Sequence, residues 1–158
     1  MNRKTNRRWL VTGLLAVMLT TTGCQRHTLY HHYEHTPLTA WEKSDTLFFA
    51  VRKMTDRAVI RRDVELRISD RYPYQQLCLV VEQTTLPSRF MRRDTLNCRL
   101  TDSEGEMLGK GVTLYQKTFH LPDISLNEGD SLAIKVHHAM KRQSLPGIAD
   151  VGILLKAY

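Results

Sequence analysis

Cys24 is the residue in this sequence whose surroundings most clearly predict a covalent reaction. Four cations within residues 3–8 precede an apolar run over residues 9–19, and three threonines and Gly23 lie between that run and the cysteine. Cations, a short apolar segment and a small residue before the cleavage point are the parts of a bacterial export signal. A cysteine directly after such a cleavage point can receive lipid on its thiol and on its new amino group. We therefore predict a lipoprotein signal peptide over residues 1–23 and a covalent diacylglyceryl and N-acyl lipid on Cys24.

The apolar run is too short to be a membrane span. It has about half the ~20 residues that a transmembrane helix needs, so it fits the apolar region of an export signal. Bacterial lipoboxes usually carry Leu three residues before the cysteine, whereas this sequence has Thr21. A plain signal peptide with an incidental cysteine is therefore the alternative. Acyl chains on Cys24 would contribute about 0.8 kcal/mol for each buried methylene and hold the protein at a membrane.

Three histidines after the cysteine have the spacing of metal ligands on a helix. His27, His31 and His35 are each four residues apart, and imidazoles at that spacing stack on one helical face. The segment has no helical apolar face, however, Pro37 follows closely, and no cysteine or paired acid is near. We therefore expect residues 24–40 to form a flexible, solvated tether, and we expect no metal site.

The adjacent pair His137 and His138 lies in a predicted strand. Neighbouring side chains on a strand point to opposite faces, so these two imidazoles cannot bind one metal ion together. His138 shares its phase with Val136 and Met140. That phase predicts an inward-facing histidine with a hydrogen-bond partner.

Signatures of catalysis are missing from the sequence. It contains no G-x-S-x-G, no H-E-x-x-H and no Gly-rich phosphate loop. Acidic residues mostly alternate outward along the predicted strands, as they do on solvated faces. We therefore expect a protein that is not an enzyme and has no cofactor. A hydrolase whose paired carboxylates meet only in the folded chain is the least supported hypothesis.

The basic character of the chain belongs partly to the export signal. Residues 1–23 hold four of the 23 basic residues and none of the 16 acidic ones, so residues 24–158 carry a formal net charge of +3. An exported domain with so small a charge excess is not expected to bind nucleic acid.

Apolar residues recur at every second position from about residue 45 to the end of the chain. Such alternation is typical of strands with one face against a core, and no stretch sustains a helical i, i+3, i+4, i+7 pattern. The alternating sets are Leu47, Phe49 and Val51; Val64, Leu66 and Ile68; Leu96, Cys98 and Leu100; Leu132, Ile134 and Val136; and Val151, Ile153 and Leu155. We predict an all-β domain over residues 41–158, an antiparallel β-sandwich (Ig-like or jelly-roll-like) of seven to eight strands, with a small closed barrel as the alternative.

The phase of this alternation also predicts two local features. Between Leu114 and Tyr115 the apolar phase slips by one residue, which predicts a β-bulge there. Cys98 is in phase with its leucine neighbours, whereas Cys78 is out of phase with its own, so the two sulfurs point to opposite faces. We expect two free, partly buried thiols.

Aromatic residues offer one candidate binding surface. Trp41 lies at the start of the predicted domain, and Tyr72 and Tyr74 bracket Pro73 in a turn. We favour a structural role for them at the end of the sandwich, and stacking against a sugar is the alternative.

A loop near the C-terminus offers the second candidate surface. Five residues between two predicted strands could contact a protein partner, with turn formation as the alternative reading. These candidate docking residues are Lys141, Arg142, Leu145, Pro146 and Gly147.

Motifs after the lipobox follow a characteristic order. Trp41 is followed by R-x-x-Y-P-Y-x-x-L in looser spacing over residues 67–77, by D-x-x-G-x-x-L-G-K-G over residues 102–111, and by M-K-R-x-x-L-P-G-I-A-D-V-G-I over residues 140–153. In this order they resemble the gliding-motility lipoprotein GldH family over essentially the whole mature chain. The resemblance implies a cell-envelope lipoprotein without known catalytic residues that supports gliding and the linked protein-secretion apparatus. Homologues in non-gliding relatives widen the implied role beyond motility.

The residues directly after Cys24 bear on the choice of membrane. No Asp follows the cysteine, which favours the outer membrane, and the absence of an acidic cluster there resembles lipoproteins that stay facing the periplasm. We therefore expect a lipid-anchored outer-membrane protein that docks onto envelope proteins of a motility or secretion complex. A glycan-binding envelope lipoprotein is the alternative.

Overall fold

The computed structural model describes residues 27–37 and 39–158, and within them the fold is built from strands without helices. The predicted signal peptide and Cys24 lie outside the described residues. No helix among the described residues is long and apolar enough to cross a membrane. The strands are β1 (His27–His35), β2 (Trp41–Glu42), β3 (Leu47–Val51), β4 (Ala58–Ser69), β5 (Gln76–Leu86), β6 (Phe90–Arg99), β7 (Leu114–Leu126), β8 (Ser131–His138), β9 (Ser144–Leu145) and β10 (Ile148–Ala157).

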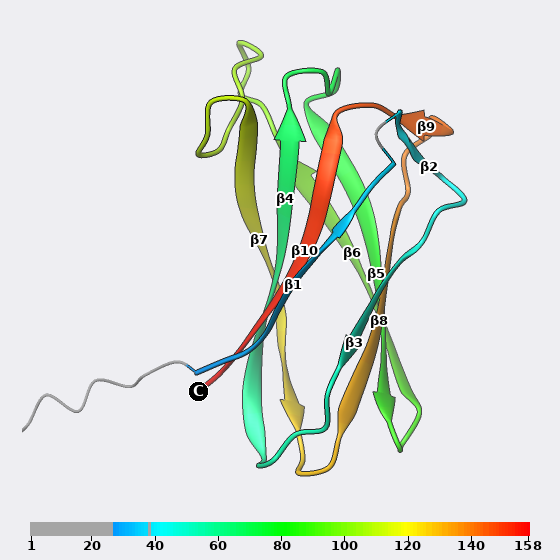
Figure 1. Cartoon of the computed structure of the whole chain (residues 1–158), viewed down its shortest axis with the longest axis vertical. Coiled ribbons are helices and arrows are strands. Elements are labelled where there is room, and N and C mark those ends of the chain that lie inside the picture. Colours follow the sequence, from blue (N-terminus) through cyan, green and yellow to red (C-terminus); the bar gives the residue numbers. More distant parts are fainter. Residues whose placement is uncertain (1–26, 38) are drawn as a thin grey trace, which may run out of the picture.

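Eight of these strands form two four-stranded antiparallel sheets that pack face to face (Figure 1). One sheet has the order β1-β10-β4-β7, the other has the order β3-β8-β5-β6, and β2 and β9 form a separate short pair. The predicted antiparallel sandwich is therefore confirmed, and the closed barrel is excluded because the two sheets do not join. The core lies between the sheets, where β4 contributes Val64, Leu66 and Ile68 and β5 contributes Leu77 and Leu79.

The tether predicted over residues 24–40 is wrong for its central part. Residues 27–35 are β1, which pairs antiparallel with the last strand, from His27 opposite Ala157 to His35 opposite Asp150. Within the described residues the sandwich therefore begins at residue 27 rather than at residue 41. The sequence pattern missed this strand because β1 is an edge strand whose side chains contact mainly polar groups, so it lacks the apolar alternation of the other strands.

The predicted β-bulge also lies elsewhere. Residues 114–121 of β7 pair regularly with β4, and the register shifts only between Ile60 and Arg62, where one residue of β4 faces Pro122 and Asp123 of β7. Proline has no N–H to donate to a ladder, so a bulge is a position where it fits inside a strand. The bulge changes the phase of the buried positions between Leu121 and Leu126.

The two cysteines are free, as predicted, and Cys98 is more deeply buried than the expected partial burial. Cys98 is buried and Cys78 is half-buried, and neither forms a disulfide. In the β5–β6 register Cys98 lies opposite Leu77 while Cys78 lies opposite Asn97. Because successive positions alternate between faces, the two sulfurs are directed to opposite sides of the sheet. Burial raises the pKa of the Cys98 thiol to about 12.

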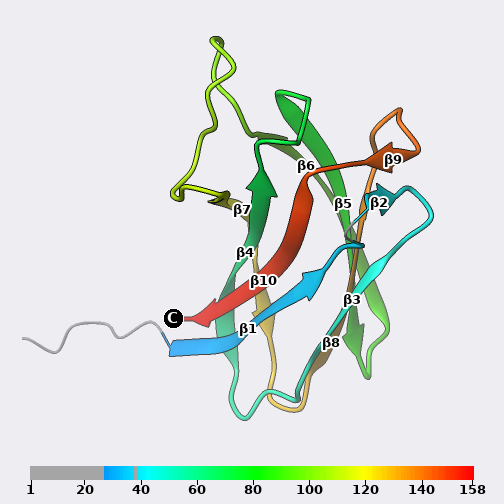
Figure 2. The ribbon, with the colours of Figure 1, turned by 45° about the horizontal axis from the view of Figure 1, so that its top comes forward.

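The sandwich has two ends that carry different connections (Figures 1 and 2). The lower end, as drawn in Figure 1, holds the start of β1, the end of β10, the β5–β6 turn over residues 87–89, and the connections over residues 52–57 and 127–130. The upper end holds the connections over residues 70–75, 100–113 and 139–147, together with the β2–β9 pair.

Candidate functional site

A cluster of histidines and carboxylates covers the outer face of the β1-β10-β4-β7 sheet. Three acidic side chains on this face are almost fully covered: Asp63, Glu65 and Asp150 are only 5%, 8% and 7% exposed. Each is paired with a histidine from another strand, which is unlike the solvated outward acids that the sequence pattern predicted. The outer-face cluster consists of His31, Tyr33, His35, Asp63, Glu65, His120 and Asp150.

The residues of this cluster lie in rows that run across the four strands. Tyr33 on β1 lies opposite Gly152 on β10, which lies opposite Glu65 on β4, which in turn lies opposite Thr118 on β7. Side chains directly opposite one another on a sheet face are close enough to interact. The rows on either side bring His35 to Asp150 and Asp63 to His120 in the same way.

Glu65 is the centre of the outer-face cluster. It accepts a hydrogen bond from the hydroxyl of Tyr33, lies 2.8 Å from Nε2 of His31, and lies 3.4 Å from the hydroxyl of Thr118. Burial opposes ionisation of this carboxyl and is the largest single influence, but these hydrogen bonds together lower the pKa of Glu65 below its usual range. Burial and the hydrogen bond to Glu65 raise the pKa of Tyr33 to about 12.

The ring of Tyr33 packs directly over Gly152 of β10, where a larger residue would collide with the ring. A Cβ atom added at Gly152 would lie 2.6 Å from Cε1 of Tyr33. From above, the guanidinium of Arg67 lies 3.9 Å from the ring centroid, and Gln116 donates a 3.0 Å hydrogen bond to the tyrosine oxygen. The tyrosine is therefore held on every side by other strands, and it fixes β1 to the sheet.

The outer-face cluster links the strands of its sheet to one another. Each of its three carboxylates is paired with a histidine from another strand, and Glu65 also accepts a hydrogen bond from Tyr33. Among the described residues no group of three His, Cys, Asp or Glu side chains could hold a metal ion.

A second polar cluster lies between the two sheets and connects β4 with β5, β6 and β7. Arg62 is 2% exposed and points between the sheets, where it donates hydrogen bonds to Gln83, Asp94 and the carbonyl of Pro122. The Asp94 and Gln83 contacts are 2.9 and 3.1 Å. Burial lowers the pKa of Arg62, and the neighbouring Asp94 opposes that effect. The bulge at Pro122 is what presents this carbonyl to the guanidinium.

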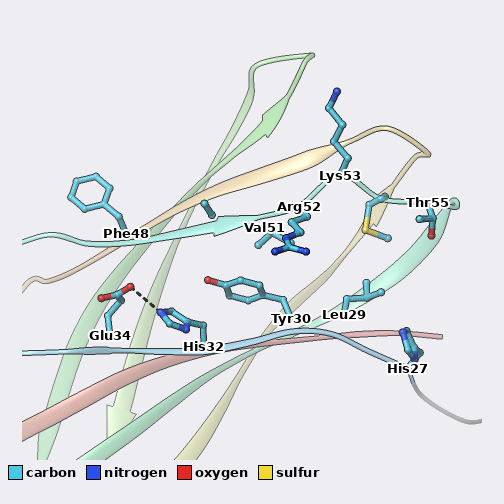
Figure 3. Close-up of a pocket in the computed structure, with 12 residues that line it drawn as sticks. His27, Leu29, Tyr30, His32, Glu34, Phe48, Val51, Arg52, Lys53 and Thr55 are labelled. Atoms are coloured by element: carbon cyan, nitrogen blue, oxygen red, sulfur yellow. Dashed lines mark hydrogen bonds and ion pairs between the residues drawn. The ribbon is translucent and has the colours of Figure 1, made fainter.

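An open groove runs along the side of the sandwich where the two edge strands β1 and β3 face each other (Figure 3). Its volume is about 750 Å³, and Figure 3 shows the rings of Tyr30 and His32 pointing from β1 toward β3. On the other side it is lined by Val51, Arg52 and further residues up to Thr55. We refer to this feature, lined by residues 27–34 of β1 and residues 48–55, as the β1–β3 groove.

Of the three predicted sugar-stacking residues, Tyr72 and Tyr74 lie together, and Trp41 is not part of their hollow. Trp41 is fully buried, donates from Nε1 to the carbonyl of Asp45, and packs against a histidine ring, so it presents no face to a ligand. Tyr72 is also buried, but its ring meets that of the half-buried Tyr74 edge to face at 5.6 Å. These two tyrosines line a hollow of about 420 Å³ at the upper end with Tyr115.

The predicted docking loop has both exposed and buried members. Lys141, Arg142 and Pro146 are exposed. Leu145 is fully buried and pairs with Trp41 in the β2–β9 ladder, so it can act only as support. Gly147 has a φ of +83° and touches the backbone of the Tyr72 turn, which explains the need for glycine there.

His138 is buried as predicted but lacks the expected hydrogen-bond partner. Neither ring nitrogen is hydrogen-bonded, and the ring packs edge-on against Trp41 at 5.3 Å. Burial lowers the pKa of His138, and a weaker interaction with the Trp41 backbone opposes this shift without reaching hydrogen-bond geometry. The imidazole is therefore a neutral part of the core.

The chain is similar to known proteins over most of its length. The family model described as GldH lipoprotein matches residues 28–155. A protein from Flavobacterium johnsoniae named "Gliding motility lipoprotein GldH" is 26% identical over 150 residues, which cover 90% of this chain and 93% of that protein.

Among solved structures, a chain from the structure of infectious bursal disease virus, Gx strain, aligns with 84% of this chain at 12% identity and a TM-score of 0.34. The alignment spans about a third of the viral chain, 32%, and the score is too low to establish a shared fold. The family match, in contrast, contains eight of the ten described strands, β2 to β9, completely, together with most of β1 and of β10. The chain therefore belongs to the GldH lipoprotein family.

Proposed function

We propose that this protein is an outer-membrane lipoprotein, anchored by lipid on Cys24 and facing the periplasm, which supports gliding motility and the associated protein-secretion machinery without catalysing a reaction. It acts by binding other envelope proteins. The observation that carries the proposal is the β1–β3 groove, where two sheet edges flank an open hollow on a protein whose buried acids are all internally paired.

The lipid anchor is supported by the family and by the sequence. The family and the Flavobacterium relative are both named as lipoproteins. In this chain Cys24 follows an apolar run and a small residue, as lipidation requires.

Protein contacts are supported by the edges of the sandwich. Within the described residues, β1 and β3 each have one strand neighbour, so each leaves one edge on which an extended segment of another protein can add. Phe48 on β3 is 61% exposed beside the groove, and such an aromatic side chain suits a protein contact. Lys141 and Arg142 give the upper end a separate, charged contact surface.

In-cell photo-crosslinking tests this proposal. A photoreactive amino acid is placed at Phe48 beside the groove, at Lys141 in the loop, and at Asn97, which is exposed on β6, the strand farthest from β3 in its sheet. We expect envelope proteins to be captured from position 48 or 141 and not from position 97. Absence of any captured protein from positions 48 and 141, under conditions that preserve other envelope complexes, would contradict the proposal.

Depletion of the protein tests the cellular role. Secretion of exported proteins and integrity of the envelope are scored together, with gliding scored where the organism glides. The proposal predicts that secretion or gliding fails while the envelope barrier is intact. Loss of the barrier with normal secretion and gliding would contradict it.

A glycan-binding role is the second candidate, and the hollow at the upper end favours it. The hollow of about 420 Å³ combines tyrosine rings with the carboxylates of Asp70 and Glu106, which is a suitable set of groups for a sugar. In a glycan-array assay, this role predicts binding that is lost in Tyr74→Ala and kept in Phe48→Ala. Equal binding by both variants, or no binding by the wild type, would exclude it.

A further inference from the structure

The lower end of the sandwich holds both the start of β1 and the β5–β6 hairpin, which lie on opposite sides of that end (Figures 1 and 2). In one sheet the start of β1 pairs with the end of β10, which pairs with the start of β4. In the other sheet the end of β3, the start of β8, the end of β5 and the start of β6 lie side by side. The connections over residues 52–57 and 127–130 join these two rows of strand ends, and Figures 1 and 2 both show them at one end.

The tip of this hairpin exposes large apolar side chains. Leu86, Phe90 and Met91 are 40%, 66% and 70% exposed, although the hairpin contains only a short turn between its strands. Arg89 is exposed beside them, and so is Arg93, whose Nε lies 3.6 Å from Oε1 of Glu82. Apolar side chains at a tip, flanked by arginines, are typical of a segment that enters the interface of a lipid bilayer.

The length of chain before β1 fixes which end of the sandwich faces the membrane. Only Gln25 and Arg26 lie between Cys24 and His27, the first residue of β1. Three residues span at most about 11 Å, so His27 at the start of β1 lies within about 11 Å of Cys24, the residue that carries the lipid. A long tether would let the sandwich rotate freely, whereas this short one holds the lower end toward the bilayer.

The charge of the lower end suits an anionic surface. The three segments over residues 52–57, 86–93 and 127–130 contain six basic residues against three acidic ones, an excess of +3, and two of these basic residues, Arg92 and Arg93, are ion-paired with Asp94 and Glu82 outside the segments. Each basic residue near an anionic leaflet strengthens membrane binding. The acidic residues are Asp56, Glu128 and Asp130, and the last of these already accepts a hydrogen bond from the backbone N–H of Asn127.

We propose that the β5–β6 hairpin inserts Leu86, Phe90 and Met91 into the interfacial layer of the bilayer that carries the lipid anchor, with Arg89 and Arg93 against the headgroup phosphates. This inference rests on the proposed anchoring through Cys24. The hairpin and the lipid then form two attachment points at one end of the sandwich. The upper end, with its long connections and the docking loop, faces away from the membrane.

Depth-dependent fluorescence quenching tests the hairpin in the lipidated protein. Phe90→Trp and Val112→Trp are each reconstituted in vesicles of phosphatidylethanolamine and phosphatidylglycerol that contain brominated acyl chains. Val112 is 91% exposed at the upper end and serves as the matched control, and the buried Trp41 gives the same background in both variants. We expect the emission of the tryptophan at position 90 to be quenched at least several-fold more than that at position 112. Equal, weak quenching of the two would overturn the proposal.

A second arm separates the hairpin from the anchor. Residues 25–158, which contain every strand that the structure describes, are produced without lipid and floated with the same vesicles. We expect the bound fraction to fall about tenfold when Leu86, Phe90 and Met91 are all replaced by serine and to stay unchanged in Val112→Ser, whose apolar side chain is 91% exposed at the upper end. Unchanged flotation of the triple variant would overturn the proposal, as would crosslinking of the tip to a second copy or to a protein partner in place of lipid. Failure of Cys24 to take up palmitate, with hairpin-dependent flotation intact, would refute the anchor and leave the hairpin supported.

Discussion

Replacing Gly152 by alanine tests whether residues 27–35 really form a strand of the sandwich. The new Cβ would lie 2.6 Å from Cε1 and 2.8 Å from Cδ1 of Tyr33, closer than side-chain atoms can approach. The tyrosine ring would therefore move, and its hydrogen bond to Glu65 and its contact with Arg67 would weaken. Overpacking costs about 1–3 kcal/mol and a lost hydrogen bond to a charged group about 1.5–3 kcal/mol. Because these effects overlap, we expect Gly152→Ala to lower the free energy of unfolding by about 2–3 kcal/mol.

The background with Tyr33 replaced by alanine makes this prediction specific. Without the ring there is open space above position 152, and alanine is better than glycine inside a strand by about 0.5–1 kcal/mol. We expect Gly152→Ala to become neutral or stabilising in that background, so that the double-mutant cycle gives a coupling energy of about 3 kcal/mol. Urea denaturation of residues 25–158 followed by far-ultraviolet circular dichroism measures all four proteins. The same effect of Gly152→Ala in both backgrounds would show that β1 does not pack on the sheet and would refute the reasoning.

Three further predictions concern buried groups. The pKa of His138 is lowered from its usual 6.5, so as the pH falls below 6.5 this imidazole is protonated in the unfolded chain before it is protonated in the folded chain. The protein therefore loses stability below pH 6.5, by at most about 1.4 kcal/mol per pH unit, and His138→Leu should remove this loss. Urea denaturation at pH 5.5 and pH 8 measures the difference. Asp94→Leu leaves the guanidinium of Arg62 buried without its carboxylate partner and should lower the free energy of unfolding by about 3–5 kcal/mol. The double variant, Asp94→Leu with Arg62→Met, should recover most of that loss. Equal free energies of unfolding for the single and double variants would contradict this prediction. Gly147→Ala places a Cβ 2.4 Å from the backbone nitrogen of Tyr72 at a φ of +83° and should lower the melting temperature by several degrees, and an unchanged melting temperature would exclude the strained contact.

The strands of the core could be predicted from the sequence because each buries one face. Val64, Leu66 and Ile68 alternate with polar residues and are all fully buried, and the same pattern located β3, β8 and β10. Alternation reports contact with an apolar core, and these strands have such a core on one side. The free cysteines follow from the same rule, since phase along the strand determines which face each sulfur takes.

The first strand could not be found in this way because its contacts are polar. His31, Tyr33 and His35 occupy every second position and contact Glu65 and Asp150, groups that the pattern assigned to a solvated face. The pairing that buries these acids comes from opposite ends of the chain. A spacing of four residues between histidines fits either a helix face or one face of a strand, so the spacing alone did not distinguish the two.

The roles of the candidate site residues depended on long-range pairing. Trp41 and Leu145 are buried because β2 and β9 pair with each other, although about a hundred residues separate them in the chain. No local pattern predicts that pairing, so Leu145 was expected to contact a partner, and sugar stacking by Trp41 was kept as the alternative to a structural role. The exposed members of the same loop, Lys141 and Arg142, were correctly expected at the surface.

Incorporation of radiolabelled palmitate is the measurement that tests the lipid-anchored account most directly. The wild type, Cys24→Ala and Cys78→Ser are expressed in the native host, and the immunoprecipitated chains are compared. We predict label in the wild type and in Cys78→Ser, with none in Cys24→Ala. An unlabelled wild type, or label that persists in Cys24→Ala, would contradict anchoring through Cys24.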